Sequence, residues 1–280
     1  MRFYDEIKLV ICDLDGSLLN HDHKIGIKDQ ETLISLGKRK ILRVIATGRN
    51  LYSTSMVLKN SPLIDIAVIS TGLGIIDYQT REFLHSNILK SFHVQALADF
   101  LITQKVDFMI HAPLPDNHYI FCYDAGTGHP DFMLRWGWYR NFASDLPSDI
   151  SYLKDASQFV VFLPKDSLKF DQIRNQLVEF SVVRTTSPIT AHYDWMEIFP
   201  PDVSKGHALQ WLCRKYNFDI ANTLCLGNDY NDLDMLRTAG KSFVTENAPE
   251  DLKSEFRVTV SNNDDPLTEI VRNYEDCQEN

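Results

Sequence analysis

The stretch VICDLDGSLLN, residues 10–20, places two carboxylates directly after an apolar run. Residues 7–12 are typical of a buried strand. Asp13 and Asp15 follow it, and Gly16 lets the backbone turn at once. Adjacent carboxylates repel each other, so they are expected where a cation binds or where a strand ends at solvent. The carboxyl ends of the strands of an open parallel sheet are also where ligands bind. A simple turn or helix N-cap is the alternative interpretation of this stretch taken alone.

Short apolar runs alternate with helical patterns around this stretch and again near the end of the chain. The apolar runs lie at residues 7–12, 41–47, 65–70, 223–227, 241–245 and 257–260, and the helical patterns at 28–40, 51–60, 204–217, 230–239 and 266–274. Continuous apolar strands separated by helices indicate a parallel sheet that is covered on both faces. We therefore predict an α/β fold with a Rossmann-like parallel sheet.

The sequence pattern changes in the middle of the chain. Alternating strand patterns lie at 106–111, 118–123 and 158–164, with amphipathic helical patterns near 93–103 and 166–178. This arrangement indicates a second α/β unit with a half-exposed antiparallel sheet, inserted into the first. We predict a core of residues 1–84 and 191–280 and an inserted domain of residues 85–190.

Composition excludes several classes of protein. The net charge of −10 argues against nucleic acid and anionic membranes as partners. No apolar run approaches the roughly 20 residues that span a bilayer, and the first residues, MRFYDEIK, lack a signal-peptide pattern. The five scattered cysteines indicate neither a disulfide framework nor a zinc site. We expect a cytoplasmic protein, and no pattern specifies an oligomeric state.

Three further polar clusters each close an apolar strand or open the next helix. ATGRN (46–50) ends the second strand with Thr47, Gly48 and Arg49. PPDVSKGHAL (200–209) places Lys205 at the start of a helix, where free backbone N–H groups also favour an anion. LGNDYNDLDML (226–236) ends a later strand in asparagines and aspartates. A turn, a solvated lysine or an N-cap explains each cluster alone, but four such clusters indicate one site.

In this order the four clusters resemble the motifs of the haloacid dehalogenase superfamily of phosphotransferases, in its Cof-like branch of sugar-phosphate phosphatases. The family's DxDGT is matched at 13–17 with serine for threonine, its second motif by Thr47 and its third by Lys205. Its GDxxND is matched by GNDYND, in which Asn228 replaces the first aspartate. The resemblance covers residues 1–82 and 195–280. It implies a Rossmann-like hydrolase core, and it implies that the inserted α/β domain is a cap that selects the substrate.

The resemblance also implies the roles of individual residues. Phosphate monoesters are among the slowest bonds to hydrolyse in water, and a covalent intermediate splits the displacement into two easier steps. Asp13 would be the nucleophile that forms an aspartyl-phosphate, and Asp15 would be the general acid and base. Catalysis would also need Thr47 and Lys205. The phosphate oxygens would be held by Leu14, Thr47, Gly48, Lys205 and Asn231. Mg²⁺ would be bound by Asp13, Asp15 and the fourth motif.

Asn228 is the departure from the family pattern that matters most. An amide oxygen can bind Mg²⁺, but the exchange removes one negative charge from beside the cation. At an effective dielectric constant near 20, a unit charge pair 4 Å apart is worth about 4 kcal/mol before hydration offsets it. Either Asn228 binds the metal more weakly, or the neighbouring Asp229 takes its place. Asp232 would orient a metal-bound water. Arg49 would either bind phosphate or serve as a structural partner of the acidic cluster.

The implied substrate is a small phosphorylated metabolite, a sugar phosphate in particular. HPDFMLRWGWYRNF (129–142) either supplies aromatic rings to a sugar or packs as a helix against the cap sheet. Two other functions remain open: a phosphomutase of the same superfamily, and a catalytically weak relative that binds a phosphorylated metabolite for regulation. The chain lacks GxxxxGK[ST] and GxGxxG patterns, which argues against a nucleotide kinase or a dehydrogenase.

Overall fold

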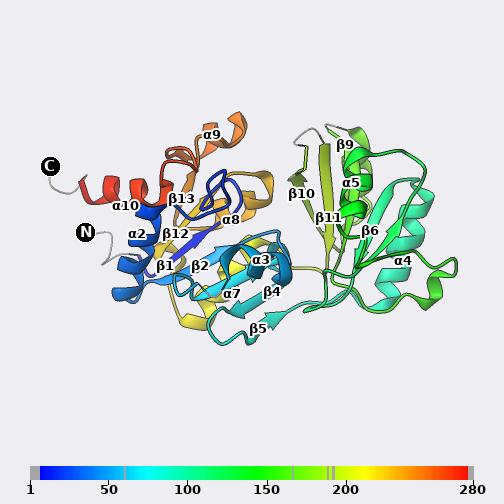
Figure 1. Cartoon of the computed structure of the whole chain (residues 1–280), viewed down its shortest axis with the longest axis horizontal. Coiled ribbons are helices and arrows are strands. Elements are labelled where there is room, and N and C mark those ends of the chain that lie inside the picture. The colour runs from blue at the N-terminus through cyan, green and yellow to red at the C-terminus, as the bar shows by residue number, and fades with distance from the viewer. Residues whose placement is uncertain (1–6, 60, 166, 188, 191–192, 277–280) are drawn as a thin grey trace. The chain divides into compact units, whose positions relative to one another are not determined.

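The computed structural model describes residues 7–276 except residues 60, 166, 188 and 191–192. It divides the chain into two compact units. The core unit consists of Met1–His85 and Ser204–Asn280, and the inserted unit of Ser86–Val203. In Figure 1 the core unit runs from blue to cyan and from yellow to red, and the inserted unit from turquoise to yellow-green.

The core unit is built on an eight-stranded sheet with the order β14-β13-β12-β1-β2-β3-β4-β5. Strands β14 to β3 pair in parallel with their neighbours, and β4 pairs with β3 in the antiparallel sense. All residues of β1 and β3 are buried, as predicted for continuous apolar strands. The strands are β1 (Leu9–Cys12), β2 (Leu42–Ala46), β3 (Ile66–Ile69), β4 (Gly74–Asp77), β5 (Phe83–Ser86), β12 (Thr223–Gly227), β13 (Lys241–Val244) and β14 (Arg257–Val258).

Helices pack against this sheet, which confirms the predicted α/β class. Leu9 and Ile11 of β1 share a hydrophobic cluster with Leu209 of α7, while α2 contacts both β2 and α10. The helices are α2 (Ile27–Lys38), α3 (Leu51–Leu58), η1 (Ser70–Gly72), α7 (Lys205–Tyr216), η3 (Ile220–Asn222), η4 (Tyr230–Asp232), α8 (Leu233–Thr238), α9 (Glu250–Glu255) and α10 (Pro266–Asp276).

The caps of α7 fix the position of its first residue. The side chain of Ser204 is the N-cap and accepts the N–H of His207. Asn217 ends the helix in the left-handed conformation, with φ of 55°. Lys205 is therefore the first helical residue, and its side chain is fully buried.

The inserted unit has a six-stranded sheet with the order β10-β11-β9-β6-β7-β8, antiparallel except for the parallel pair β7–β8. The strands are β6 (Asp107–His111), β7 (Ile120–Tyr123), β8 (Ala143–Asp145), β9 (Gln158–Pro164), β10 (Ser181–Thr186) and β11 (Tyr193–Phe199). The helices are α4 (Ser91–Thr103), α5 (Pro130–Trp138), η2 (Ile150–Tyr152) and α6 (Leu168–Arg174).

The central strands of the inserted sheet are buried on both faces, which differs from the half-exposed sheet that the sequence predicted. All of β6 and all but the last residue of β9 are buried. Phe108 lies in one hydrophobic cluster with residues of α4 and α6, and Phe132 of α5 packs with Phe162 in a second cluster. The aromatic stretch is thus a helix that covers the second face. Trp138, at its end, is exposed.

The second junction between the units lies later in the chain than we expected. We expected the core to resume at residue 191, whereas the structure divides the chain after Val203. The difference is β11, which pairs with both β9 and β10 and is therefore part of the inserted sheet. The first junction lies after His85.

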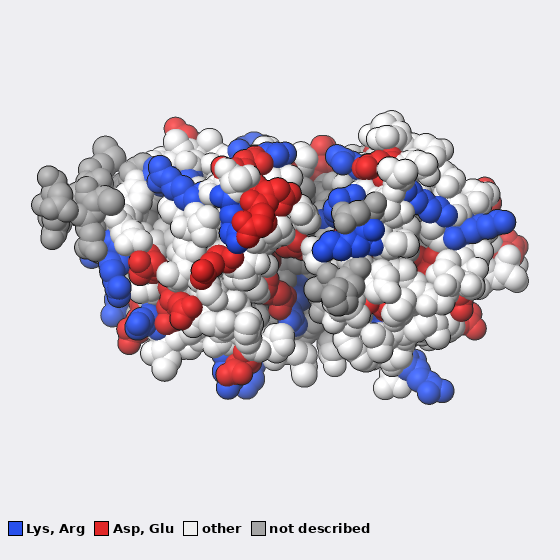
Figure 2. All heavy atoms as spheres, turned by 90° about the horizontal axis from the view of Figure 1, so that it is seen from above, with Lys and Arg blue, Asp and Glu red and all other residues white. Residues whose placement is uncertain are grey.

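Charged side chains of both signs lie among uncharged ones on the face shown in Figure 2. Acidic residues predominate over the whole chain, with 38 Asp and Glu against 28 Lys and Arg. No helix in the described part of the chain is long and apolar enough to span a bilayer.

Candidate active site

Three strands bring polar residues to one edge of the core sheet. β12, β1 and β2 are adjacent and parallel, so the residues that follow them leave the sheet at the same edge. These residues are Asp13 after β1, Thr47 after β2 and Asn228 after β12. The Asp13 N–H still donates to the carbonyl of Leu226, at 2.8 Å, so its backbone is fixed by the sheet.

A buried lysine joins Asp13 to the fourth motif. Lys205 Nζ lies 2.6 Å from Oδ1 of Asp13 and 2.6 Å from Oδ1 of Asp232. The side chains of Lys205 and Asp232 are fully buried, and that of Asp13 is 7% exposed. Burial opposes the charged form of the lysine, but the two carboxylates raise the pKa of Lys205 above its ordinary value. Lys205 is therefore a permanent cation beside Asp13.

Asp13 is strongly perturbed by its surroundings. Burial raises the pKa of Asp13 to about 8 against the opposing charge of Lys205, and the carboxylates of Asp232 and Asp15 add to the rise. A nucleophilic carboxylate must be ionised. More positive charge beside Asp13 would therefore make it a better nucleophile at neutral pH.

Arg49 holds the carboxylate of Asp15. Its Nε donates to Oδ2 and its Nη2 to Oδ1, both at 2.7 Å, which is a bidentate pair. The backbone N–H of Arg49 donates to Oγ1 of Thr47 at 3.1 Å, so the second motif also fixes the turn that carries this arginine. The Asp15 side chain is 41% exposed and remains open to solvent. Of the two roles considered for Arg49, the structure shows that of a partner for the acidic cluster.

The loop after β1 requires glycine at position 16. Gly16 has φ of +79°, and a Cβ there would lie 2.5 Å from the Asn228 side chain. The carbonyl of Gly16 accepts hydrogen bonds from Thr245 Oγ1 at 3.1 Å and from Asn247 Nδ2 at 2.9 Å. We did not identify Thr245 and Asn247 from the sequence, because they support the site only through the backbone of another loop.

The residues assigned to phosphate binding lie around the same edge. Thr47 is buried. A Cβ on Gly48 would lie 3.7 Å from Nδ2 of Asn231, so the second and fourth motifs are neighbours. The side chain of Leu14 is fully buried in the core. Only the backbone of Leu14 is therefore a candidate for contact with a ligand.

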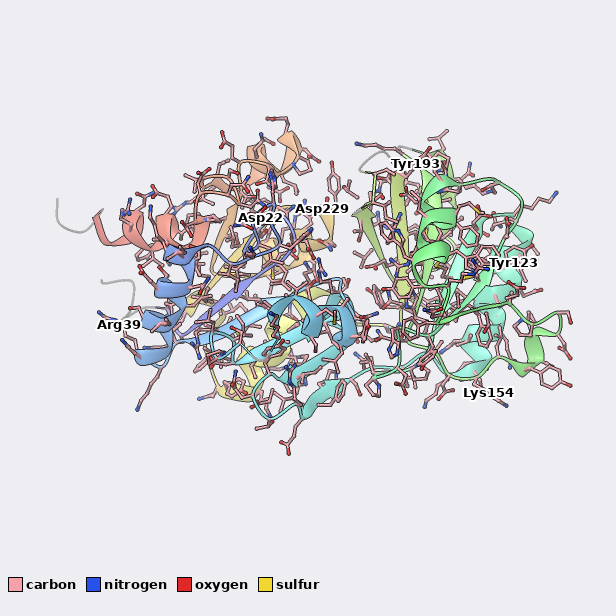
Figure 3. All side chains as sticks on the ribbon, viewed as in Figure 1. Asp22, Arg39, Tyr123, Lys154, Tyr193 and Asp229 are labelled. Carbon is pink, nitrogen blue, oxygen red and sulfur yellow. The ribbon has the colours of Figure 1, made fainter. Side chains whose placement is uncertain are left out.

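The fourth motif brings Asn228 to the aspartates. One terminal atom of its side-chain amide lies 2.9 Å from the carbonyl oxygen of Asp15, 3.0 Å from Ser17 Oγ and 3.1 Å from Oδ2 of Asp13. The side chain of Asp229, labelled in Figure 3, caps the short helix η4 by accepting the backbone N–H of Asp232. Asn228 thus contacts the acidic pair, while Asp229 shapes the loop.

Asp232 contacts both the buried lysine and the loop of the fourth motif. We expected this carboxylate to orient a metal-bound water, and that role stays a prediction. Its Oδ1 accepts from Nζ of Lys205 at 2.6 Å, and its Oδ2 accepts the N–H groups of Asn228 at 2.8 Å and Asp229 at 3.1 Å. Asp232 therefore positions both the lysine and the loop that carries Asn228.

The groups around the Asn228 amide fit a magnesium ion. A carboxylate oxygen of Asp13 and the backbone carbonyl of Asp15 both lie within 3.1 Å of the same amide atom, and such oxygens are preferred ligands of Mg²⁺. Rotating the Asn228 amide by half a turn would place a third oxygen beside these two. Among the described residues, no group of three or more His, Cys, Asp or Glu is arranged to hold a metal.

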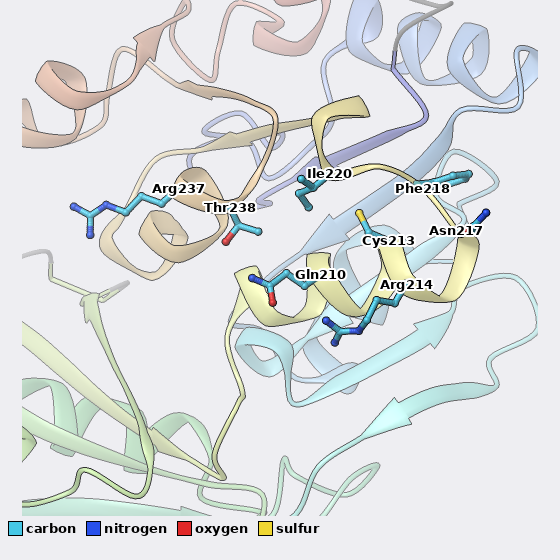
Figure 4. Close-up of a pocket in the computed structure, with 8 residues that line it drawn as sticks. All are labelled: Gln210, Cys213, Arg214, Asn217, Phe218, Ile220, Arg237 and Thr238. Carbon is cyan, nitrogen blue, oxygen red and sulfur yellow. The ribbon is translucent and has the colours of Figure 1, made fainter.

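A pocket of about 660 Å³ lies elsewhere in the core unit, between α7, η3 and α8 (Figure 4). It is lined by Gln210, Cys213, Arg214, Asn217, Phe218, Ile220, Arg237 and Thr238. Ile220 precedes β12, whereas Asn228 follows it, so the pocket lies towards the opposite end of that strand from the aspartates. It contains none of the four motifs and is not part of the candidate site.

Known proteins match the chain over nearly its whole length. A family model described as haloacid dehalogenase-like hydrolase matches residues 10–270. The chain is 22% identical over 276 residues to the 5-amino-6-(5-phospho-D-ribitylamino)uracil phosphatase YwtE of Bacillus subtilis, covering 92% of this chain and 94% of that protein. It is 28% identical over 256 residues to the HMP-PP phosphatase of Cronobacter sakazakii, covering 89% and 88%. The structure of BT1666 from Bacteroides thetaiotaomicron, among the phosphatases of that superfamily, has the same fold, with a TM-score of 0.79 at 19% identity over 96% and 95% of the two chains.

Proposed function

This chain belongs to the haloacid dehalogenase-like hydrolases, and we propose that it is a Mg²⁺-dependent phosphatase that hydrolyses a sugar phosphate through an aspartyl-phosphate on Asp13. Its relatives are phosphatases of small phosphorylated metabolites, and this chain is a phosphoric monoester hydrolase of the same kind. The observation that carries the mechanism is the buried Lys205, 2.6 Å from Asp13 at the carboxyl edge of the sheet. A buried cation placed on a buried carboxylate suits the transfer of an anionic phosphoryl group.

In the first step a carboxylate oxygen of Asp13 attacks phosphorus, and the bond from phosphorus to the substrate alcohol breaks. Asp15 gives a proton to the departing alcohol, and Lys205 balances part of the phosphoryl charge. Mg²⁺, when bound by Asp13, the Asp15 carbonyl and Asn228, supplies positive charge that favours the ionised form of Asp13.

In the second step Asp15 takes a proton from a water molecule, which attacks phosphorus and releases Asp13. Arg49 orients Asp15 for both steps through its bidentate contact. One of these two hydrogen bonds must be released while Asp15 carries a proton, because an arginine only donates. Arg49 therefore acts as a positioning residue.

The remaining phosphate oxygens bind the backbone of Leu14, the Thr47 hydroxyl, the Gly48 N–H and the Asn231 amide. Support for this assignment comes from the approach of Gly48 to Asn231 and from the place of Thr47 at the end of β2. Each of these groups has an N–H or O–H that can donate a hydrogen bond to an anion.

The inserted unit acts as the cap that selects the substrate. It has a sheet and hydrophobic clusters of its own. We expected it to span residues 85–190, and the structure gives a compact unit of Ser86–Val203. Because it is a separate folding unit, its surface can vary without disturbing the catalytic edge of the core sheet.

The function is tested by turnover of p-nitrophenyl phosphate with Mg²⁺, followed by a panel of sugar phosphates and nucleotides. Asp13→Asn should abolish turnover, whereas Asp15→Asn should accumulate a phosphorylated protein after acid quenching, detected by the mass of one phosphoryl group on the peptide that contains Asp13. Asp22→Asn, at an exposed position of the following loop, is the matched control and should keep its activity. Release of inorganic phosphate distinguishes hydrolysis from transfer to a second sugar. Retention of substantial activity by Asp13→Asn would refute the covalent mechanism.

A further inference from the structure

The orientation of the Asn228 amide follows from its neighbours. The amide atom that faces the acidic pair lies 2.9 Å from the backbone carbonyl of Asp15. A backbone carbonyl only accepts hydrogen bonds, so the facing atom is the amide nitrogen. The same NH₂ group also lies within hydrogen-bond distance of Asp13 Oδ2 and Ser17 Oγ.

This NH₂ group lies next to the place that a cation would take. It is 3.1 Å from Oδ2 of Asp13 and 2.9 Å from the carbonyl oxygen of Asp15, which are the two groups of the loop after β1 that suit Mg²⁺. Mg²⁺ binds its oxygen ligands at about 2.1 Å, so an ion would lie between these oxygens and the amide. The NH₂ group has two donors and carries partial positive charge, so it satisfies these acceptors without a metal. An aspartate at this position would instead add a third carboxylate beside Asp13 and Asp15.

We propose that the side-chain amide of Asn228 replaces the contacts of the metal when Mg²⁺ is absent. The amide has two orientations, which exchange when Mg²⁺ binds. Without Mg²⁺ its NH₂ group holds Asp13 and the loop after β1 in place. With Mg²⁺ the amide rotates about the Cβ–Cγ bond and presents its oxygen to the ion. The metal-free site is therefore assembled in advance. Mg²⁺ binds less tightly than it would beside an aspartate at position 228, because it displaces hydrogen bonds of the amide and meets one carboxylate fewer. This inference rests on the proposed Mg²⁺ position, but not on turnover.

The variant Asn228→Asp tests both halves of this proposal. Without metal it should melt at a lower temperature than the wild type in EDTA, because a repulsive contact replaces an attractive one. Its dissociation constant for Mg²⁺, measured by calorimetry, should be lower by at least about tenfold. Mg²⁺ should accordingly raise its melting temperature more than it raises that of the wild type. The readouts need no substrate, so they are independent of whether Asp13 is the nucleophile.

Asn20→Asp is the matched control. Asn20 lies in the same loop, and its Oδ1 accepts the N–H groups of Asp22 and Lys24, contacts that a carboxylate keeps. This control should leave the metal-free melting temperature unchanged and the Mg²⁺ dissociation constant within about twofold of the wild type. An effect of the same size in both variants would mean that general charge, and not the position of Asn228, sets the affinity, and it would overturn the proposal.

The rotation itself is tested in the wild-type protein by NMR. In EDTA the side-chain NH₂ signals of Asn228 should exchange slowly with water, and Mg²⁺ should shift them and speed their exchange. This measurement decides the matter if Asn228→Asp fails to fold. Unchanged Asn228 NH₂ signals at saturating Mg²⁺ would overturn the proposal, as would a metal-free Asn228→Asp protein that is as stable as the wild type.

Discussion

Removing the charge of Lys205 is expected to destabilise the core unit strongly. The variant Lys205→Met keeps the length and apolar stem of the side chain but removes its ammonium group. In the wild type this group lies 2.6 Å from Asp13 and 2.6 Å from Asp232, and all three side chains are at least nine-tenths buried. Deleting one partner of a buried ion pair typically costs about 3–5 kcal/mol, because the other charge remains buried without compensation.

The remaining contacts place the expected cost near the lower end of this range. Asp232 keeps the N–H groups of Asn228 and Asp229, at 2.8 and 3.1 Å, so its Oδ2 stays hydrogen-bonded. Asp13 keeps the side-chain amide of Asn228. We therefore expect Lys205→Met to lower the free energy of unfolding of the core unit by about 3 kcal/mol at pH 8.

The loss should depend on pH. Burial already raises the pKa of Asp13 to about 8 while Lys205 lowers it, so removing the lysine raises the folded pKa further. A carboxylate whose pKa is higher in the folded state contributes stability at low pH and loses it as the pH rises through the folded pKa. The gap between variant and wild type should thus be nearly constant from pH 5 to pH 7, where Asp13 is protonated in both folded proteins, and should widen above about pH 8, by up to about 1.4 kcal/mol per pH unit, because only the variant still holds the proton there.

Hydrogen exchange of peptides that cover β1 and β12 would report the stability of the core unit alone. Lys253→Met is the control, since Lys253 pairs with a Glu250 side chain that is 90% exposed, and it should change stability by less than about 1 kcal/mol. The double variant Lys205→Met/Asp232→Asn should recover part of the loss, because it removes one of the two uncompensated charges. A loss below about 1 kcal/mol, or one that does not grow between pH 7 and pH 9, would refute the charge-pair account of this site.

Three other outcomes are expected. Asp13→Asn should reduce p-nitrophenyl phosphate turnover to a small fraction of the wild-type rate while leaving the circular dichroism spectrum unchanged; a folded variant with wild-type activity would exclude Asp13 as the nucleophile. Burial raises the pKa of Asp29 to about 6. The variant Asp29→Asn keeps an acceptor for Thr268 and should raise the free energy of unfolding by up to about 3 kcal/mol at pH 8 and by little at pH 4. Denaturation at the two pH values measures this difference, and an equal effect at both would contradict the account. Replacing residues 86–203 by a short linker should leave a folded core that hydrolyses p-nitrophenyl phosphate but has lost selectivity among sugar phosphates, and a core that fails to fold would contradict the separate-unit proposal.

The catalytic edge of the core sheet could be predicted because its strands are simple. β1 and β12 are continuous apolar runs buried on both faces, so their ends could be placed from the sequence. Parallel neighbours then bring Asp13, Thr47 and Asn228 to one edge without further information. Pattern and topology therefore predicted which side chains would meet.

Contacts that depend on side-chain direction could not be predicted in this way. The sequence did not predict that the turn of η4 directs the Asp232 carboxylate to Lys205. The extent of the inserted sheet was missed for a similar reason. An apolar strand such as β11 fits either sheet by pattern, and only its pairing with β9 and β10 assigns it to the inserted unit.

The charges of the site explain why one amide has large consequences. The described ion pairs join three carboxylates, Asp13, Asp15 and Asp232, to two cations, Lys205 and Arg49, so the network carries one net negative charge whenever Asp13 is ionised, as a nucleophile must be. An aspartate in place of Asn228 would double that charge beside the proposed binding site of a phosphate dianion. The amide thus lowers the repulsion that the substrate meets, but it does not remove the need for a cation, because the network stays negative. We therefore expect phosphate to bind weakly without Mg²⁺ even though the site is already assembled.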